Sequence, residues 1–215
     1  MGAIADRVAA VRDRIEAVAS DPARVTLVAV CKGVDPGRVA EAVAAGVDDL
    51  GENYAQELLA KRSEVGGQLR WHFLGAVQRR KVRALAPAVH LWHSVDRQAA
   101  GEEIARRAPG AQVLVQVNVT GAPHRNGCPW GETAGLVGRL HDLGLQVRGL
   151  MCIGPRPDPR PAFRRLAQTA SALGLGELSM GMSEDLEAAV EEGATIVRVG
   201  RDIFGPRDER PELRR

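Results

Sequence analysis

A single lysine ends an otherwise apolar run near the start of the chain. Residues 26–32 read TLVAVCK, so Lys32 follows a segment with the composition of a strand buried on both faces. The ordinary role of such a lysine is structural, because its stem packs on apolar neighbours while its ammonium reaches water. The alternative is chemical, because a desolvated amine is nucleophilic and can form a Schiff base with an aldehyde. The lysine alone does not decide between these interpretations.

A second group of chemically capable residues lies near the other end of the chain. In the run SMGMSEDLEAAVEEG, Ser183 stands where a helix N-cap belongs, with Glu184 and Asp185 in the first turn. Free N–H groups at a helix N-terminus can bind an anion. In the following VRVGRDIFG, Gly200 lets backbone approach a ligand, and Arg198 or Arg201 can neutralise a phosphate. The ordinary interpretation of the same residues is a helix cap followed by a turn.

The remaining composition narrows the class of protein. The formal net charge is +2, from 29 Lys and Arg against 27 Asp and Glu, which does not indicate a nucleic-acid or membrane surface. The three cysteines, Cys31, Cys128 and Cys152, have no C-x-x-C spacing, so neither a disulfide framework nor a zinc site is predicted. No signal-peptide core or apolar membrane-spanning run is present, and we expect a cytoplasmic protein.

Short β-branched runs alternate with amphipathic stretches along the whole chain. Eight runs are predicted to be strands: 24–30, 47–51, 69–75, 89–95, 112–119, 146–153, 177–180 and 195–200. Helical spacing predicts helices between them, over 36–45, 54–64, 79–85, 98–107, 132–143, 162–173 and 184–192. This alternation predicts parallel β-α units, in a doubly wound sheet or in a closed barrel.

Eight repeats favour the barrel, an α/β fold in which catalytic and binding groups gather at the C-terminal ends of the strands. Only fifteen residues follow the last predicted strand, too few for a full eighth helix. A further helix over residues 3–19, ahead of the first strand, is predicted to fill that gap in the outer ring. We expect residues 1–215 to form one domain, with a polar tail from about residue 206 to 215 and long loops over 121–130 and 154–161.

The motifs, taken in order, resemble the YggS/PROSC family of pyridoxal phosphate (PLP) homeostasis proteins, which are related to the barrel domain of alanine racemases. The resemblance rests on AVCK, GENYAQE, WHFLGAVQRRK, VQVNV, RGLMCI, LSMGMSEDLEAAVEEGATIVRVG and DIFG, and it covers nearly the whole chain. It implies a single-domain TIM (β/α)8 barrel that holds pyridoxal 5'-phosphate as a Schiff base on Lys32.

The resemblance also implies roles for further residues. Ser183 and the Gly200–Arg201 turn would hold the phosphate, and Arg198 would approach the pyridine ring or the phosphate. Met182 is a further cofactor-binding candidate. Asn53, from GENY, would line the ring's edge. His72, from WHF, is the last candidate, although a histidine satisfied inside the barrel is the alternative for it.

Three positions depart from the family pattern. Arg80 replaces the asparagine of G-x-x-Q-x-N-K, which leaves a more basic helix start. Arg125 replaces the lysine usual in the loop after the fifth strand, and an arginine cannot form an imine. Arg201 replaces a small hydroxyl residue beside the phosphate, so that contact would be ionic. These changes bear on cofactor transfer rather than on cofactor binding.

Three functions follow as alternatives. The family implies a PLP carrier without strong catalytic activity, which would buffer PLP or deliver it to PLP-dependent apoenzymes. The second is an amino-acid racemase or decarboxylase, but Arg198 would keep the pyridine nitrogen unprotonated, and Tyr54 is the one tyrosine available as a second acid/base. The third is a scaffold with a vestigial site. The family implies a monomer, with a weak dimer as the alternative.

Overall fold

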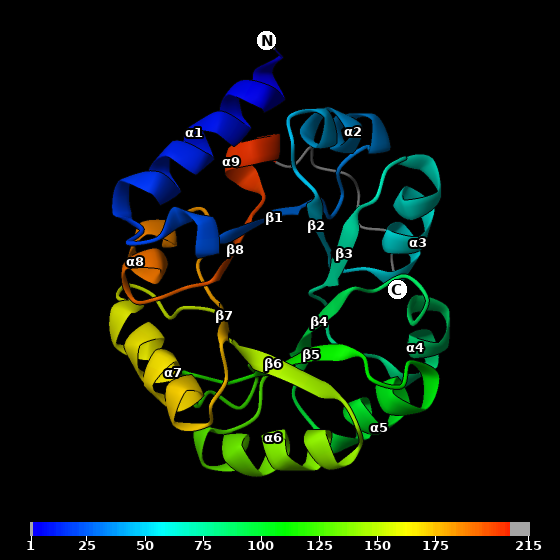
Figure 1. Ribbon diagram of the computed structural model, residues 1–215, viewed down its shortest axis with the longest axis vertical. Helices are drawn as coiled ribbons and strands as arrows, with labels where there is room; N and C mark the ends of the chain where they lie inside the picture. The colour runs from blue at the N-terminus through cyan, green and yellow to red at the C-terminus, as the bar shows by residue number, and fades with distance from the viewer. Residues whose placement is uncertain (1, 207–215) are drawn as a thin grey trace.

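The computed structural model describes residues 2–206, and these form a closed barrel of parallel strands surrounded by helices (Figure 1). The eight strands pair in chain order, and β1 pairs with β8 to close the ring. The predicted TIM-barrel fold is therefore confirmed. The strands are β1 Thr26–Val30, β2 Asp49–Glu52, β3 Arg70–Phe73, β4 Leu91–Val95, β5 Gln112–Gln116, β6 Gln146–Met151, β7 Glu177–Ser179 and β8 Ile196–Val199.

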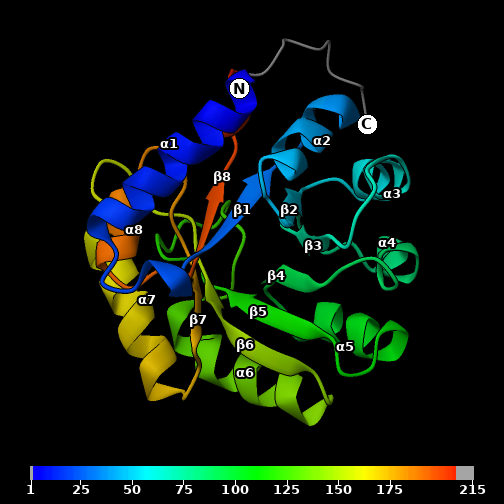
Figure 2. The ribbon, with the colours of Figure 1, turned by 45° about the horizontal axis from the view of Figure 1, so that its top comes forward.

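Helices and two short 3-10 turns cover the outside of the barrel (Figure 2). They are α1 Ala3–Val18, η1 Pro22–Arg24, α2 Pro36–Ala44, α3 Ala55–Glu64, α4 Arg79–Leu85, α5 Gln98–Arg107, η2 Trp130–Glu132, α6 Thr133–Asp142, α7 Arg160–Ala172, α8 Leu186–Glu191 and α9 Arg201–Phe204. Their apolar faces pack on the outward side chains of the strands, which joins them in one large core cluster. Within the described residues, no helix has the length and apolarity to cross a bilayer.

The N-terminal helix completes the outer ring as predicted. After β8 the chain forms only the single turn of α9, and α1 contacts α9, α8 and α2 at that place. Ile4, Val8, Val11 and Ile15 lie at helical spacing on the buried face of α1. Arg14 extends the same contact, because its guanidinium binds Glu187 of α8 and Asp202 of α9. The predicted polar tail lies, apart from its first residue, outside the described part of the chain.

The barrel interior is split between apolar and polar side chains. A cluster separate from the outer core is made by five strand residues: Val28, Leu91, Leu114, Met151 and Ile196. Buried polar side chains, among them His72 of β3, His93 of β4 and Arg198 of β8, share the interior with them. The interiors of such barrels are usually filled by branched apolar residues, so this polar content calls for hydrogen-bond partners.

Candidate functional site

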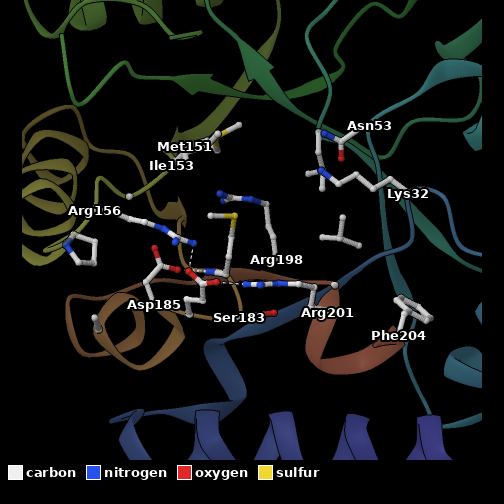
Figure 3. Close-up of a pocket in the computed structure, with 18 of the residues that line it drawn as sticks. Lys32, Asn53, Met151, Ile153, Arg156, Ser183, Asp185, Arg198, Arg201 and Phe204 are labelled. Atoms are coloured by element: carbon white, nitrogen blue, oxygen red, sulfur yellow. Dashed lines mark hydrogen bonds and ion pairs between the residues drawn. The ribbon is translucent and has the colours of Figure 1, made fainter. Parts of the chain in front are cut away.

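A cavity of about 540 Å³ opens at the end of the barrel where the strands terminate. Lys32 and Asn53 line one side of it, after β1 and β2, and Ser183, Gly200 and Arg201 line the other, after β7 and β8. Figure 3 shows Arg198 between these two sides. We call Lys32 and Asn53 the amine wall, and Ser183, Gly200 and Arg201 the anion wall. The structure thus brings together residues from both ends of the chain, at the place where barrels of this kind bind ligands.

A buried lysine, Lys61 of α3, holds the backbone of the amine wall in place. The Lys61 ammonium donates to Glu52 Oε2 at 2.7 Å, to Glu57 Oε2 at 2.6 Å and to the carbonyl of Cys31 at 2.6 Å. Glu57 also accepts the backbone N–H of Gly33 at 2.7 Å. The residues on both sides of Lys32 are therefore held by one ionic cluster of Glu52, Glu57 and Lys61.

Two members of this ionic cluster, Glu52 and Lys61, are shielded from solvent, whereas the Glu57 side chain is 36% exposed. The side chains of Glu52 and Lys61 are 0% and 5% exposed. Burial raises the pKa of Glu52 above its ordinary value, although Lys61 opposes the shift. Burial lowers the pKa of Lys61, but its interactions with Cys31 and Glu52 outweigh that effect and raise it. A buried ion pair of this kind fixes the positions of its two groups. It adds less to the free energy of unfolding, because desolvation offsets much of its attraction.

Asn53 follows directly from the same cluster. Glu52 Oε1 accepts the backbone N–H groups of Asn53 at 2.7 Å and of Tyr54 at 3.1 Å. The Asn53 backbone also lies against Gly75, where a Cβ atom would overlap the Asn53 carbonyl. The side-chain Oδ1 of Asn53 is buried and has no hydrogen-bond partner among residues 2–206. An unpaired buried acceptor beside a cavity suits a ligand that donates a hydrogen bond.

The anion wall begins in the turn between β7 and α8, and here one sequence prediction is wrong. Helix α8 begins at Leu186, with Asp185 rather than Ser183 at the N-cap. Residues 183–185 form a turn, in which Asp185 Oδ1 accepts the N–H of Met182 at 2.6 Å. The Asp185 side chain thus closes the turn locally, which delays the helix and leaves Met182 and Ser183 lining the cavity.

The rest of the anion wall is open to solvent and ionic. Glu184 forms ion pairs with Arg201 from α9 and with Arg156 from the loop after β6. These three side chains are 45%, 58% and 81% exposed, so water and salt screen their attraction. The close neighbour of Gly200 is Val30, whose carbonyl would lie 3.1 Å from an added Cβ. Packing against β1 is therefore a structural reason for this glycine.

Arg198 is the buried cation of the cavity. Its Nη1 donates to Ser179 Oγ at 2.7 Å, and its Nη2 donates to the carbonyl of Cys152 at 2.9 Å. Within the described chain, no carboxylate forms an ion pair with it. Burial lowers the pKa of Arg198 below its ordinary value, although a guanidinium stays protonated in proteins. Two neutral acceptors thus fix this group at the edge of the cavity.

His72 does not line the cavity. It is 2% exposed inside the barrel, where its Nε2 lies 2.9 Å from Asp49 Oδ1 and its Nδ1 lies 2.8 Å from His93 Nε2. The structure therefore agrees with the alternative interpretation, a histidine whose hydrogen bonds are satisfied inside the barrel, because the His72 side chain points from β3 into the interior rather than into the cavity. Arg80 and Arg125 are exposed and do not line the cavity either.

Sequence reasoning missed the ionic cluster and Ser179. The i, i+4 spacing of Glu57 and Lys61 signals an ion pair on a helix, but its contact with the backbone around Lys32 depends on the packing of α3 on β1. Ser179 stands inside an apolar strand, and no local spacing links it to Arg198. The three cysteines are buried and form no disulfide, and no group of three or more metal-ligating side chains occurs among the described residues.

The cavity residues fit a small phosphate ester that carries an aldehyde on an aromatic ring. Lys32 supplies an amine, and Ser183 and Arg201 supply donors for a phosphate. The Arg198 guanidinium can donate to a ring nitrogen, and the unpaired Asn53 Oδ1 can accept from a ring substituent. Pyridoxal 5'-phosphate has each of these features.

Comparison with known proteins agrees with this assignment of groups. The family model described as "Alanine racemase, N-terminal domain" matches residues 1–208. The pyridoxal phosphate homeostasis protein of Pseudomonas aeruginosa is 41% identical, with 97% of each chain covered. The protein of the same name from Escherichia coli K12 is 34% identical, with 97% of this chain and 98% of that one covered.

Solved structures show the same fold. PipY of Synechococcus elongatus, solved with PLP bound, has a TM-score of 0.84 and 34% identity, covering 94% of this chain and 100% of that one. Alanine racemase from Corynebacterium glutamicum has a TM-score of 0.69 at 18% identity, covering 94% of this chain and 61% of the racemase. The racemase likeness concerns the barrel fold alone.

Proposed function

Because the chain belongs to the family of pyridoxal phosphate homeostasis proteins, we propose that it binds pyridoxal 5'-phosphate as a Schiff base on Lys32 and buffers or delivers it inside the cell. The observation that carries this proposal is that Lys32 lines one cavity together with Ser183, Gly200 and Arg201. The chain contains three lysines, Lys32, Lys61 and Lys81, and Lys32 is the one that lines the cavity. When bound, PLP supplies an aldehyde that condenses reversibly with an amine and releases water.

The proposed roles divide the cavity between its walls. Lys32 binds the aldehyde carbon, and Asn53 accepts a hydrogen bond at the ring's edge. Ser183 and the Gly200–Arg201 turn bind the phosphate, with Met182 packing beside it. The Arg198 guanidinium, a permanent donor, faces the ring and favours an unprotonated pyridine nitrogen.

A carrier is favoured over a racemase or decarboxylase. The curated relatives are named for homeostasis rather than for catalysis. An unprotonated ring nitrogen weakens the electron sink on which PLP enzymes depend. Tyr54, the one tyrosine of the chain, is 57% exposed and does not line the cavity, so it cannot act there as a second acid/base. The scaffold alternative would require a cavity that takes up no PLP.

The first test is spectroscopic. The purified protein is titrated with PLP, its absorption in the near ultraviolet and visible is recorded, and the complex is reduced with borohydride before peptide mapping. We expect a band that reduction traps on Lys32, and Lys32→Ala should lose it while remaining folded. Lys81→Ala is the matched control, because Lys81 contacts Gln56 outside the cavity. A band that persists in Lys32→Ala would overturn the assignment, and a protein that takes up no PLP would favour the scaffold.

Two further predictions accompany this function. We propose that residues 1–215 act as one PLP-binding domain, which the closure of the barrel within residues 2–206 supports. A monomer in the cytoplasm remains our expectation, to be measured by sedimentation and by cell fractionation. Catalysis is measured separately, by incubating the PLP complex with amino acids and following racemisation and decarboxylation.

A further inference from the structure

A continuous line of buried hydrogen bonds runs through the barrel from its opposite end to the cavity. It starts at Asp49, the first residue of β2, and passes through His72 of β3 and His93 of β4. It then crosses the interior to Ser179 of β7, with 2.9 Å between His93 Nδ1 and Ser179 Oγ, and ends at Arg198 of β8. The strands β4 and β7 are not neighbours in the sheet, so this link spans the barrel rather than following its wall.

The two ends of the line differ in charge and in surroundings. Arg198 lines the cavity, whereas Asp49 lines a separate hollow at the other end of the barrel. Asp49 also binds Arg70, with Oδ1 2.7 Å from Nε and Oδ2 2.5 Å from Nη2. Burial raises the pKa of Asp49, but the hydrogen bonds from His72 and Arg70 outweigh it and lower the pKa to about 2. The line therefore joins a buried cation to an ionised carboxylate.

When His72 is neutral, donor and acceptor rules give the direction of every bond in it. An ionised Asp49 only accepts, so His72 Nε2 carries a proton, and a neutral His72 ring then accepts at Nδ1. His93 Nε2 must donate to that atom, which leaves His93 Nδ1 as an acceptor for the Ser179 hydroxyl. Ser179 Oγ in turn accepts from Arg198 Nη1. Each donor points away from the cation and toward the anion.

We infer that Asp49, His72, His93 and Ser179 are positioning residues that hold the Arg198 guanidinium in the cavity through one polarised chain of hydrogen bonds. The inference rests on the proposed function, because it gives Arg198 its ligand. The aligned dipoles offset the cost of burying a guanidinium that forms no ion pair with a carboxylate among residues 2–206. They also hold the Ser179 hydroxyl as a donor to His93, so that its oxygen remains free to accept from Arg198.

The chain has one alternative arrangement. If His72 carried protons on both nitrogens, its Nδ1 would donate to His93 Nε2, and His93 Nδ1 would donate to Ser179. Ser179 Oγ would then accept from His93 and from Arg198 together, and its own proton would need another acceptor. Asp49 and His90 lie against the His72 ring, and Arg70 pairs with Asp49. His72, Arg198 and His90 are the charged or titratable groups that act on His93. Burial lowers the pKa of His93 well below its ordinary value, and the nearby positive groups add a smaller effect in the same direction. The His93 ring therefore stays neutral.

The direction of the chain is tested without cofactor. The full chain is labelled with nitrogen-15 in its histidines, and the tautomers are read by NMR at about pH 8, above the ordinary pKa of histidine. We expect both His72 and His93 to carry the proton on Nε2. A proton on Nδ1 of His93 would overturn the inference. This result does not depend on whether PLP binds, so it is distinguishable from a failure of the proposed function.

The effect on the cavity is tested with Ser179→Ala and Asp49→Asn. We expect PLP to bind about tenfold more weakly to each, since Arg198 loses the acceptor Ser179 Oγ or the anion that orients it. Nη proton signals of Arg198 that are slow to exchange in the parent protein should be lost in both variants. Ile196→Val is the matched control, because Ile196 pairs with Ser179 in the sheet but takes no part in the chain. It should lower stability and leave PLP affinity and the Arg198 signals unchanged.

The outcome separates positioning from packing. If PLP affinity and the Arg198 signals are unchanged in Asp49→Asn, the far end of the chain does not act on the cavity and the inference is wrong. If Ile196→Val weakens PLP binding as much as Ser179→Ala does, the effect is a general loosening of the barrel, which also overturns it. Ser179→Thr, which keeps a hydroxyl, should restore affinity.

Discussion

The two walls of the cavity are held by opposite means. The amine wall rests on the cluster of Glu52, Glu57 and Lys61, in which the side chains of Glu52 and Lys61 are at most 5% exposed. The anion wall rests on Glu184, whose ion pairs with Arg201 and Arg156 lie in solvent. A covalent bond to a ligand requires an amine at a fixed place, whereas a phosphate is bound by charge and adapts to mobile donors. The contacts that hold the backbone beside Lys32 are therefore the more buried ones.

Removing the buried cation should have the largest effect. In Lys61→Met, Glu52 keeps its burial but loses its counter-ion, and we expect unfolding free energy to fall by about 3–5 kcal/mol. The pKa of Glu52, already raised by burial, should rise further. A carboxyl whose folded pKa is raised destabilises the protein as pH increases, so the loss should be larger at pH 8 than at pH 5. Urea unfolding at both pH values measures this.

A matched substitution in α4 serves as the control. Lys81→Met removes a lysine whose hydrogen bond to Gln56 is exposed, and we expect a change within about 0.5 kcal/mol. If the two variants lost equal free energy of unfolding, Lys61 would matter no more than an exposed lysine does. The proposed contrast between the two walls would then be wrong.

The second prediction concerns the backbone beneath Asn53. In Gly75→Ala, the new Cβ would overlap the Asn53 carbonyl, and Ser94, which donates to the Gly75 carbonyl, holds Gly75 in place. We expect a loss of about 1–3 kcal/mol or more, with weaker PLP binding because Asn53 must move. Gly138→Ala in α6 is the control, since nothing lies within 4 Å of its added Cβ and a helical alanine should stabilise. Calorimetry and PLP titration measure both effects.

Much of the barrel and of its two cavity walls could be predicted from the sequence. The rest depends on contacts between residues that are far apart in the chain. The alternation of strands and helices predicts the barrel, and Lys32 and Ser183 are visible because strand ends in a barrel share one mouth. Helix α8 begins at Leu186, two residues later than the predicted start at residue 184. The reason is that Asp185 accepts a hydrogen bond from the N–H of Met182, and the chain forms a turn before the helix. Ser179 could not be found, because its partners His93 and Arg198 lie 86 and 19 residues away.

The third prediction separates binding from folding at the anion wall. In Ser183→Ala, one donor to the proposed phosphate is lost, and we expect about tenfold weaker PLP binding. Because the Ser183 hydroxyl forms no hydrogen bond with another residue of the described chain, unfolding free energy should change by less than about 0.5 kcal/mol. PLP titration and urea unfolding of the same samples measure the two effects. A loss of stability equal to the loss of binding energy would mean that Ser183 supports the wall rather than the ligand.

The smallest effect should come from Glu184, the exposed carboxylate of the anion wall. In Glu184→Gln, Arg201 and Arg156 lose their shared carboxylate, and unfolding free energy should change by less than about 1 kcal/mol. Ion pairing with Glu184 raises the pKa of Arg201, but a guanidinium is charged either way, so the variant gains free positive charge at the cavity. PLP should therefore bind up to about tenfold more tightly at low salt. That gain should vanish near 1 M salt, where the Debye length is only about 3 Å. A gain that survives high salt would show that Glu184 acts by shaping the wall, and the anion wall would then be as structured as the amine wall.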